Sequence, residues 1–189
     1  MSHPVYPFPC ADRFVFQRNC CRRVEGRILN AGCREDPARL KETFGDRVTN
    51  LDRSATAEGP ETPDFGRPLP VDVVHDMLVT PWPFADNAFD LVVLGDVLED
   101  LPPHTQGIVL VESSRVAPYL CITVPEDGPR RDPHHWTTID RAELDRILRW
   151  SGWDVLQMEE VPYGFVPRGH FVFAVRTVGT ARYWAEVAP

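Results

Sequence analysis

Acidic residues follow several short apolar runs of this sequence, at spacings that suit a ligand site. Asp52, Asp76 and Asp96 each follow such a run, and Gly32 ends the first one. If the runs are parallel strands, their carboxyl ends meet at one edge of a sheet, where open α/β folds bind small molecules. Gly32 and Asp52 alone would suit ordinary turns. Acids or glycines at four successive strand ends instead predict a nucleoside-binding crevice, with Asp52 accepting ribose hydroxyls.

The apolar runs alternate with segments of helical periodicity, which predicts an α/β fold. Strands are expected at 27–32, 47–52, 71–75, 89–94, 119–124, 153–161 and 170–178. Helices are expected at 36–44, 106–115 and from about 139 to 152. Because strands and helices alternate early and two strands close the chain, we expect a doubly wound, mostly parallel seven-stranded sheet with an antiparallel edge strand.

Residues typical of helix ends support these boundaries. Asp36 and Pro37 suit the N-cap and first turn of the second segment, and Gly45 suits its end. Thr137 begins a segment that resembles a capping box, and Gly152 ends the helix that follows.

Three parts of the chain are expected to differ in organisation. Residues 1–25 form an N-terminal extension, with a helix through Phe14 and Arg18, 26–178 form the domain, and 179–189 form a C-terminal tail. Residues 54–70 are rich in Pro, Gly, Glu and Thr, which predicts a long loop; such loops often have a function.

The composition excludes some function classes. The 189 residues carry a net charge of −8, which disfavours non-specific binding to nucleic acid or to an anionic membrane. The N-terminal residues lack the pattern of a signal peptide, and no apolar run is long enough to span a bilayer. A cytoplasmic protein is therefore expected.

The five cysteines do not indicate a metal site. They are Cys10, Cys20, Cys21, Cys33 and Cys121. They form neither CxxC pairs nor a Cys/His spacing typical of zinc, so no metal is expected.

One longer segment has a family resemblance. Residues 82–101 read WPFADNAFDLVVLGDVLEDL, and Pro133 to Thr138 read PHHWTT. Both segments resemble class I S-adenosylmethionine-dependent methyltransferases, especially the small bacterial and phage-borne ones, with a match from about 27 to 176. The resemblance implies a Rossmann-like methyltransferase fold and S-adenosylmethionine as cofactor.

The resemblance also implies roles for residues. Asp52 would hold the ribose hydroxyls, Asp76 would accept the adenine amino group, and Met77 would pack on the ring. Gly95 and Asp96 would line the methionine end, and the loop of His134 and His135 would border the acceptor. Asp96 and His134 are the catalytic candidates. The implied cofactor-binding residues are Asn30, Gly32, Cys33, Arg34, Asp52, Arg53, Asp76, Met77 and Gly95.

The first glycine motif departs from the family pattern. The family reads DxGCGxG, whereas residues 30–36 read NAGCRED, so a carboxylate and two glycines are replaced. Two interpretations are open. Arg34 turns inward and pairs with the methionine carboxylate of the cofactor, a charge-assisted contact, or the pocket is blocked.

These features predict methyl transfer from S-adenosylmethionine to a small-molecule or nucleotide-derived acceptor. The alternative is a non-catalytic methyltransferase-like protein that contacts a protein partner, forms a homodimer or binds a nucleoside. The amino-methylating signature NPPY is absent, since GDVL stands in its place, and the missing GxGxxG disfavours a dinucleotide oxidoreductase.

Overall fold

The computed structural model describes residues 13–33, 37–56, 66–126, 135–163 and 166–177. The strands are β1 Ile28–Ala31, β2 Val48–Asp52, β3 Val73–Val74, β4 Leu91–Gly95, β5 Tyr119–Pro125, β6 Trp153–Tyr163 and β7 Val166–Arg176. The helices are α1 Arg13–Arg22, α2 Pro37–Phe44, α3 Pro103–Val116 and α4 Arg141–Trp150, with short 3-10 turns η1 Gly45–Arg47 and η2 Leu98–Asp100.

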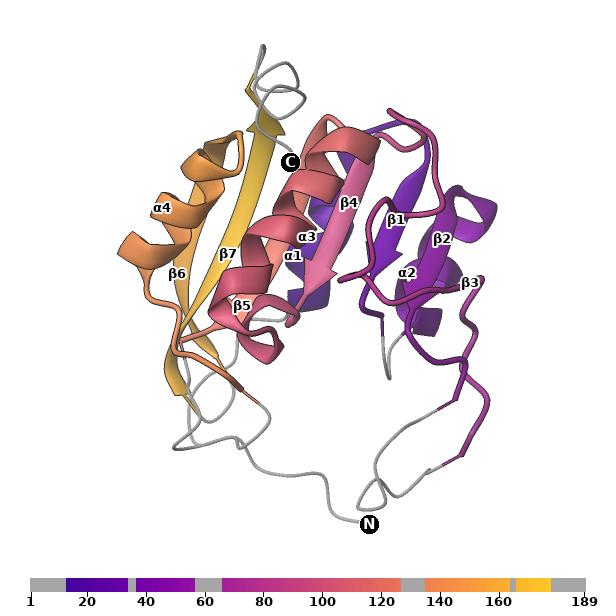
Figure 1. The fold of residues 1–189 in the computed structure, drawn as a ribbon, viewed down its shortest axis with the longest axis horizontal. Helices are drawn as coiled ribbons and strands as arrows, with labels where there is room; N and C mark the ends of the chain where they lie inside the picture. Colours follow the sequence, from indigo (N-terminus) through magenta and orange to yellow (C-terminus); the bar gives the residue numbers. More distant parts are fainter. Residues whose placement is uncertain (1–12, 34–36, 57–65, 127–134, 164–165, 178–189) are drawn as a thin grey trace.

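The strands form one seven-stranded sheet in the order β3-β2-β1-β4-β5-β7-β6 (Figure 1). The pairs from β3 to β5 are parallel, and β7 is antiparallel to both of its neighbours. This confirms the predicted mostly parallel α/β sheet. The antiparallel strand is β7, which lies between β5 and β6. It is therefore next to the edge of the sheet, and β6 forms the edge.

Helices cover both faces of the sheet, as Figure 1 shows. On one face, α3 and α4 pack on the strands through side chains such as Leu110 and Leu148. On the other, α1 and α2 pack through Phe16, Cys20 and Leu40. Strand residues alternate between the two cores, since side chains of a strand point to opposite faces in turn. The two cores hold the carboxyl ends of the parallel strands in place.

Several predicted elements have different bounds in the structure. β3 comprises Val73–Val74 alone, although Asp72 and His75 extend its bonding to β2 through their backbone N–H groups. The capping box expected at Thr137 is wrong as a helix start. The N-cap of α4 is Asp140, three residues after Thr137, and the helix begins at Arg141. The Asp140 carboxylate accepts a 2.8 Å hydrogen bond from the N–H of Glu143.

The remaining predictions divide into matched and untested ones. The N-terminal helix is present as α1, and Gly45 follows α2 with a φ of 58°, as expected of a residue that ends a helix. The expected cap Asp36 lies outside the described residues. None of the described helices is both long and apolar enough to cross a bilayer.

Candidate functional site

A cavity of about 350 Å³ lies at the carboxyl ends of the parallel strands. Its wall contains Gly32, Asp52, Arg53, Asp76, Met77, Leu78, Asp96, Val97, Asp100, Leu101, Pro102 and Trp136. All of them except Trp136 end or follow β1, β2, β3 and β4, which lie side by side in the sheet, whereas Trp136 comes after β5. The volume is within the range of small-molecule sites, about 300–1,000 Å³. The end of the sheet that was predicted to bind a ligand therefore contains a cavity of suitable size.

Gly32 makes the first turn of the cavity wall. Its φ is 71°, in the left-handed region that glycine adopts without strain. A Cβ here would lie 2.7 Å from a methyl of Val97 and 2.9 Å from the Cε of Met77. The residue therefore has to be glycine both for its conformation and for the space that Val97 and Met77 fill.

Two carboxylates follow the next two strands. Asp52 ends β2 and is 7% exposed, and its carbonyl accepts a 2.8 Å hydrogen bond from the N–H of His75. Asp76 is exposed, and its Oδ1 accepts a 2.9 Å bond from the N–H of Leu78. One carboxylate is thus buried and the other open to solvent, with Met77 beside the second. Arg53 is exposed in the same wall.

The segment from Trp82 to Asp86, which carries much of the family resemblance, supports the wall and does not line it. The Arg115 guanidinium of α3 pairs with Glu112 and Asp86 and also donates to the carbonyls of Trp82 and Phe84. The hydrogen bond from Arg115 to the Glu112 carboxylate raises the pKa of the guanidinium. Glu112 in turn accepts a 2.8 Å bond from the N–H of Trp82. This network joins the segment to α3.

Asp96 is held in an unusual backbone conformation at the end of β4. Its φ is 54°, which non-glycine residues seldom adopt, and such outliers gather at functional sites. Its backbone N–H donates to the carbonyl of Thr123 at 2.8 Å, and its Oδ1 accepts from the Thr123 hydroxyl at 3.1 Å. Its Oδ2 pairs with the guanidinium of Arg13 on α1. Helix α1 and β5 therefore both fix this carboxylate.

Three other predicted residues lie near the cavity without lining it. Asn30 is buried, and its Nδ2 donates a 3.0 Å hydrogen bond to Oδ1 of Asn50, its partner across β1 and β2. Cys33 is 8% exposed. At Gly95, a Cβ would lie 2.6 Å from Nε2 of Gln17, so α1 covers this position closely. Arg34 and His134 lie outside the described residues.

The site also includes one aromatic residue, Trp136, to which the sequence analysis gave no role. Trp136 is 62% exposed, and its backbone N–H donates a 2.8 Å bond to the carbonyl of Glu99 in η2. His135 Nε2 lies 3.9 Å from Oδ1 of Asp100, a second cavity residue. These contacts bring Trp136 to the cavity wall and His135 beside it. Only its place in the PHHWTT motif marks Trp136 in the sequence.

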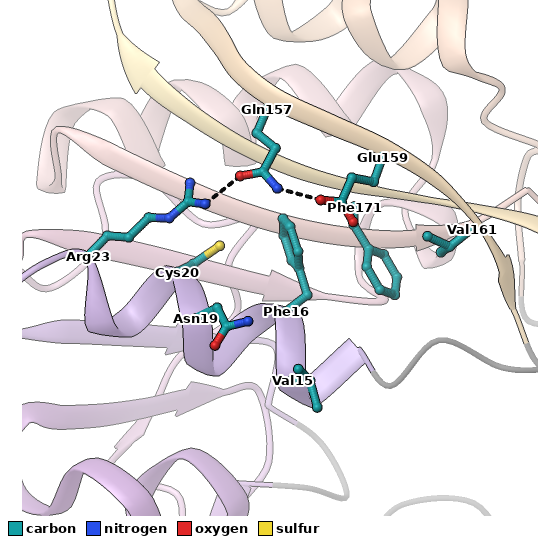
Figure 2. A pocket seen from close by; sticks show the side chains of 9 residues that line it. All are labelled: Val15, Phe16, Asn19, Cys20, Arg23, Gln157, Glu159, Val161 and Phe171. Carbon is teal, nitrogen blue, oxygen red and sulfur yellow. Dashed lines mark hydrogen bonds between the residues drawn. The ribbon is translucent and has the colours of Figure 1, made fainter.

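A second cavity of about 280 Å³ lies between α1 and the strands β6 and β7 (Figure 2). Arg23 donates to Gln157, which donates to Glu159, and the Arg23 guanidinium also stacks over Phe173. Arg23, Gln157 and Glu159 form one chain of hydrogen bonds, as the dashed lines in Figure 2 indicate, and Asn19 accepts a hydrogen bond from Arg22. The first cavity is therefore the stronger candidate for a ligand site.

Comparison with known proteins gave similarity at the level of structure. No family model and no curated protein matches the sequence. A SAM-dependent methyltransferase from Archaeoglobus fulgidus is 17% identical, covers 87% of this chain and 95% of its own, and has a TM-score of 0.58. The 1,6-didemethyltoxoflavin-N1-methyltransferase of Burkholderia thailandensis is 19% identical, covers 87% and 78%, and has a TM-score of 0.64.

The chain has the class I methyltransferase fold. This methyltransferase fold also occurs in the [4+2]-cyclase SpnF, which is 16% identical over 88% of this chain and 81% of its own, with a TM-score of 0.62. The Burkholderia structure holds S-adenosylhomocysteine and its acceptor, 1,6-didemethyltoxoflavin. One fold thus serves more than one reaction, and function has to be argued from the site.

Proposed function

We propose that this protein binds S-adenosylmethionine in the first cavity and transfers its methyl group to a small-molecule or nucleotide-derived acceptor. The observation that carries this proposal is the convergence of Gly32, Asp52 and the Asp76–Met77 turn on one cavity. Solved structures with the same fold that hold S-adenosylmethionine or S-adenosylhomocysteine support it.

The cavity residues fit the adenosine half of such a cofactor. Asp52 is the candidate partner of both ribose hydroxyls, because its carboxylate is buried at the wall and can accept two hydrogen bonds. Asp76 is the candidate for the adenine amino group, with Met77 packing on the ring. Gly32 makes the left-handed turn of the wall and lets Val97 and Met77 pack against it.

The methionine half is proposed to involve the remaining predicted residues. Gly95 and Asp96 end β4 beside it, and Arg34 is proposed to pair with the methionine carboxylate. Asn30, Cys33 and Arg53 are adjacent candidates whose roles stay predictions. When bound, the cofactor supplies an electrophilic methyl group. The task of the chain is then mainly to hold the acceptor in line with it.

The proton of the acceptor is the one part of the reaction that needs a side chain of suitable chemistry. Asp96 is proposed as the base that takes this proton from the methyl acceptor, because Asp96 lines the cavity and its carboxylate is oriented by Thr123 and Arg13. His134 remains the second candidate from the sequence. Trp136, exposed at the wall, offers a flat apolar surface for the acceptor.

Calorimetric titration with S-adenosylhomocysteine tests the cofactor site. Asp52→Ala and Asp76→Ala are expected to weaken binding about 10- to 150-fold each, since a hydrogen bond to a charged group contributes about 1.5–3 kcal/mol. Asp154→Ala is the matched control, because this carboxylate is exposed on β6 and outside the cavity wall. Absence of heat at millimolar ligand would exclude the proposal.

A second candidate function is nucleoside binding without methyl transfer. It is favoured by the ion pair between Arg13 and Asp96, which neutralises the proposed proton acceptor, and by the same fold in the cyclase SpnF. The two candidates differ in one assay. Transfer of the labelled methyl group from S-adenosylmethionine to a pool of small molecules, lost in Asp96→Asn, supports the enzyme; ligand binding without transfer supports the alternative.

A further inference from the structure

Three metal-binding side chains meet where β5, β7 and β6 lie side by side. His170 of β7 pairs with Val124 of β5 on one side and with Glu160 of β6 on the other. Glu126 follows β5 directly, and its backbone N–H continues the ladder by donating to the carbonyl of Arg168 at 3.0 Å. The ladder therefore fixes the backbone of all three residues relative to one another.

The spacing of the donor atoms suits one metal ion. One ligand atom from each of Glu126, Glu160 and His170 lies within 4.8 Å of the other two. The Nε2 of His170 is 3.1 Å from Oε2 of Glu126. Two ligands about 2.0–2.2 Å from one metal, at tetrahedral or octahedral angles, are about 2.8–3.6 Å apart. The 3.1 Å spacing of this pair is that of a hydrogen bond and also fits two ligands of one ion.

Burial and charge also favour a cation. His170 is fully buried, and its Nδ1 has no hydrogen-bond partner among the described residues, so no second contact fixes the position of the ring proton. The carboxylate of the exposed Glu160 has no hydrogen-bond or ion-pair partner within the described part of the chain.

Arg168 completes the arrangement without occupying the centre. Its guanidinium pairs with Oε1 of Glu126, whereas Oε2 of the same carboxylate faces His170. A carboxylate that ligates through one oxygen and accepts a hydrogen bond on the other is oriented by its second contact, as ligating carboxylates usually are. Arg168 can therefore stay in place when a metal binds.

We propose that Glu126, Glu160 and His170 form a binding site for one divalent transition-metal ion, for which Zn²⁺ is the best match. Imidazole and carboxylate ligands suit Zn²⁺, and three protein ligands leave a position for water. The site is distinct from the first cavity, since none of its residues belongs to that wall. It lies at the carboxyl end of β5, and it does not depend on the proposed methyl transfer.

Calorimetry on the full chain, freed of metal by a chelator and dialysed, tests the site with Zn²⁺ alone. One Zn²⁺ per chain is expected to bind, and thermal unfolding in excess Zn²⁺ is expected to shift upward because the ion binds the folded state. Glu160→Gln is the first variant, since Glu160 is exposed and the change keeps its size. The affinity of this variant for Zn²⁺ is expected to fall by more than about tenfold. Mutation of residues that only hydrogen-bond to metal ligands already lowers metal affinity by about 10–100-fold.

Glu159→Gln is the matched control. Glu159 neighbours Glu160 on β6 but lines the second cavity (Figure 2), so its variant is expected to keep the affinity. Glu126→Gln, at the residue that follows β5, provides a second test and is expected to behave as Glu160→Gln. Two results would overturn the proposal: no saturable binding of Zn²⁺, or binding that both glutamine variants leave unchanged, since the ion would then lie elsewhere.

Discussion

The indole Nε1 of Trp82 donates a 2.9 Å hydrogen bond to the backbone carbonyl of Met77. Trp82 is almost fully buried, whereas Met77 lies in the cavity wall directly after Asp76. This hydrogen bond therefore joins the segment from Trp82 to Asp86 to the wall of the first cavity. The tryptophan of the WPFAD segment acts on the candidate site through this bond, and not by touching a ligand.

Trp82→Phe is expected to lower the free energy of unfolding by more than about 0.5–1.5 kcal/mol, the usual net contribution of one hydrogen bond, because the smaller ring also leaves a cavity at this buried position. It is also expected to weaken S-adenosylhomocysteine binding, because the Asp76–Met77 turn loses its support. Denaturant unfolding and calorimetry measure the two effects. The control is Trp150→Phe, at a side chain that is 61% exposed and away from the wall. Equal affinity of both variants for S-adenosylhomocysteine would contradict the idea that Trp82 supports the Asp76–Met77 turn.

Gly32→Ala is expected to be destabilising and to impair ligand binding. A left-handed residue other than glycine costs about 1–2 kcal/mol, and the new Cβ would also crowd Val97 and Met77. Gly45→Ala separates the two effects, since Gly45 has a φ of 58° and nothing within 4 Å of its Cβ position. Unfolding experiments should therefore give a larger loss for Gly32→Ala. An equal loss would show that crowding is unimportant.

Arg115→Ala is expected to reduce stability by about 1.5–3 kcal/mol, because the buried Glu112 carboxylate and two loop carbonyls lose a charged donor. The midpoint of denaturant unfolding measures the change. Arg146→Ala removes an exposed pair with Glu143 within α4 and is expected to leave the midpoint in place. A similar shift of the midpoint in both variants would mean that the network around Glu112 contributes no more stability than an exposed ion pair.

The buried thiols are expected to react slowly in the folded protein. Burial is the main cause that raises the pKa of Cys21 from 9.0 to about 12, so this thiol stays protonated at pH 8. Cys20, Cys33 and Cys121 are also buried. Labelling with a thiol reagent, mapped by mass spectrometry, should modify these four positions promptly only in denaturant. Rapid labelling of Cys21 in the native state would contradict its burial.

The same shift predicts how stability changes in alkaline solution. Below about pH 9, Cys21 is protonated in both the folded and the unfolded chain. Between about 9 and 12 only the unfolded chain loses this proton, so the free energy of unfolding falls as the pH rises. Cys21→Ala should show a shallower fall over this range when the two proteins are compared by denaturant unfolding.

Much of the fold could be predicted because it depends on local pattern. Apolar runs such as Leu91–Leu94 ended in polar turns, and helical periodicity between them gave the α/β class and the number of strands. Bounds were less accurate where contacts elsewhere decide them. Asp140 and Thr137 are both plausible caps by type, and only the backbone geometry of the folded chain assigns the cap to Asp140.

The candidate site was predictable only in part. Asp52, Asp76 and Asp96 reach the cavity because the carboxyl ends of neighbouring parallel strands meet at one edge. Asn30 was expected there from the family resemblance alone. Its side chain donates to Asn50 inside the sheet, it is not part of the cavity wall, and its role toward a cofactor stays a prediction. Trp136 joins the wall through its backbone contact with Glu99, which no periodicity encodes.

The sequence by itself determined the elements and the chemistry at the strand ends, since both depend on residue types at short spacing. Only the tertiary structure decided which side chains meet. Glu126 and His170 are 44 positions apart and lack any metal-binding spacing, yet they are 3.1 Å apart. Their contact follows from strand order and register. Long-range packing sets both, because each strand must bury its apolar faces against its neighbours and the helices.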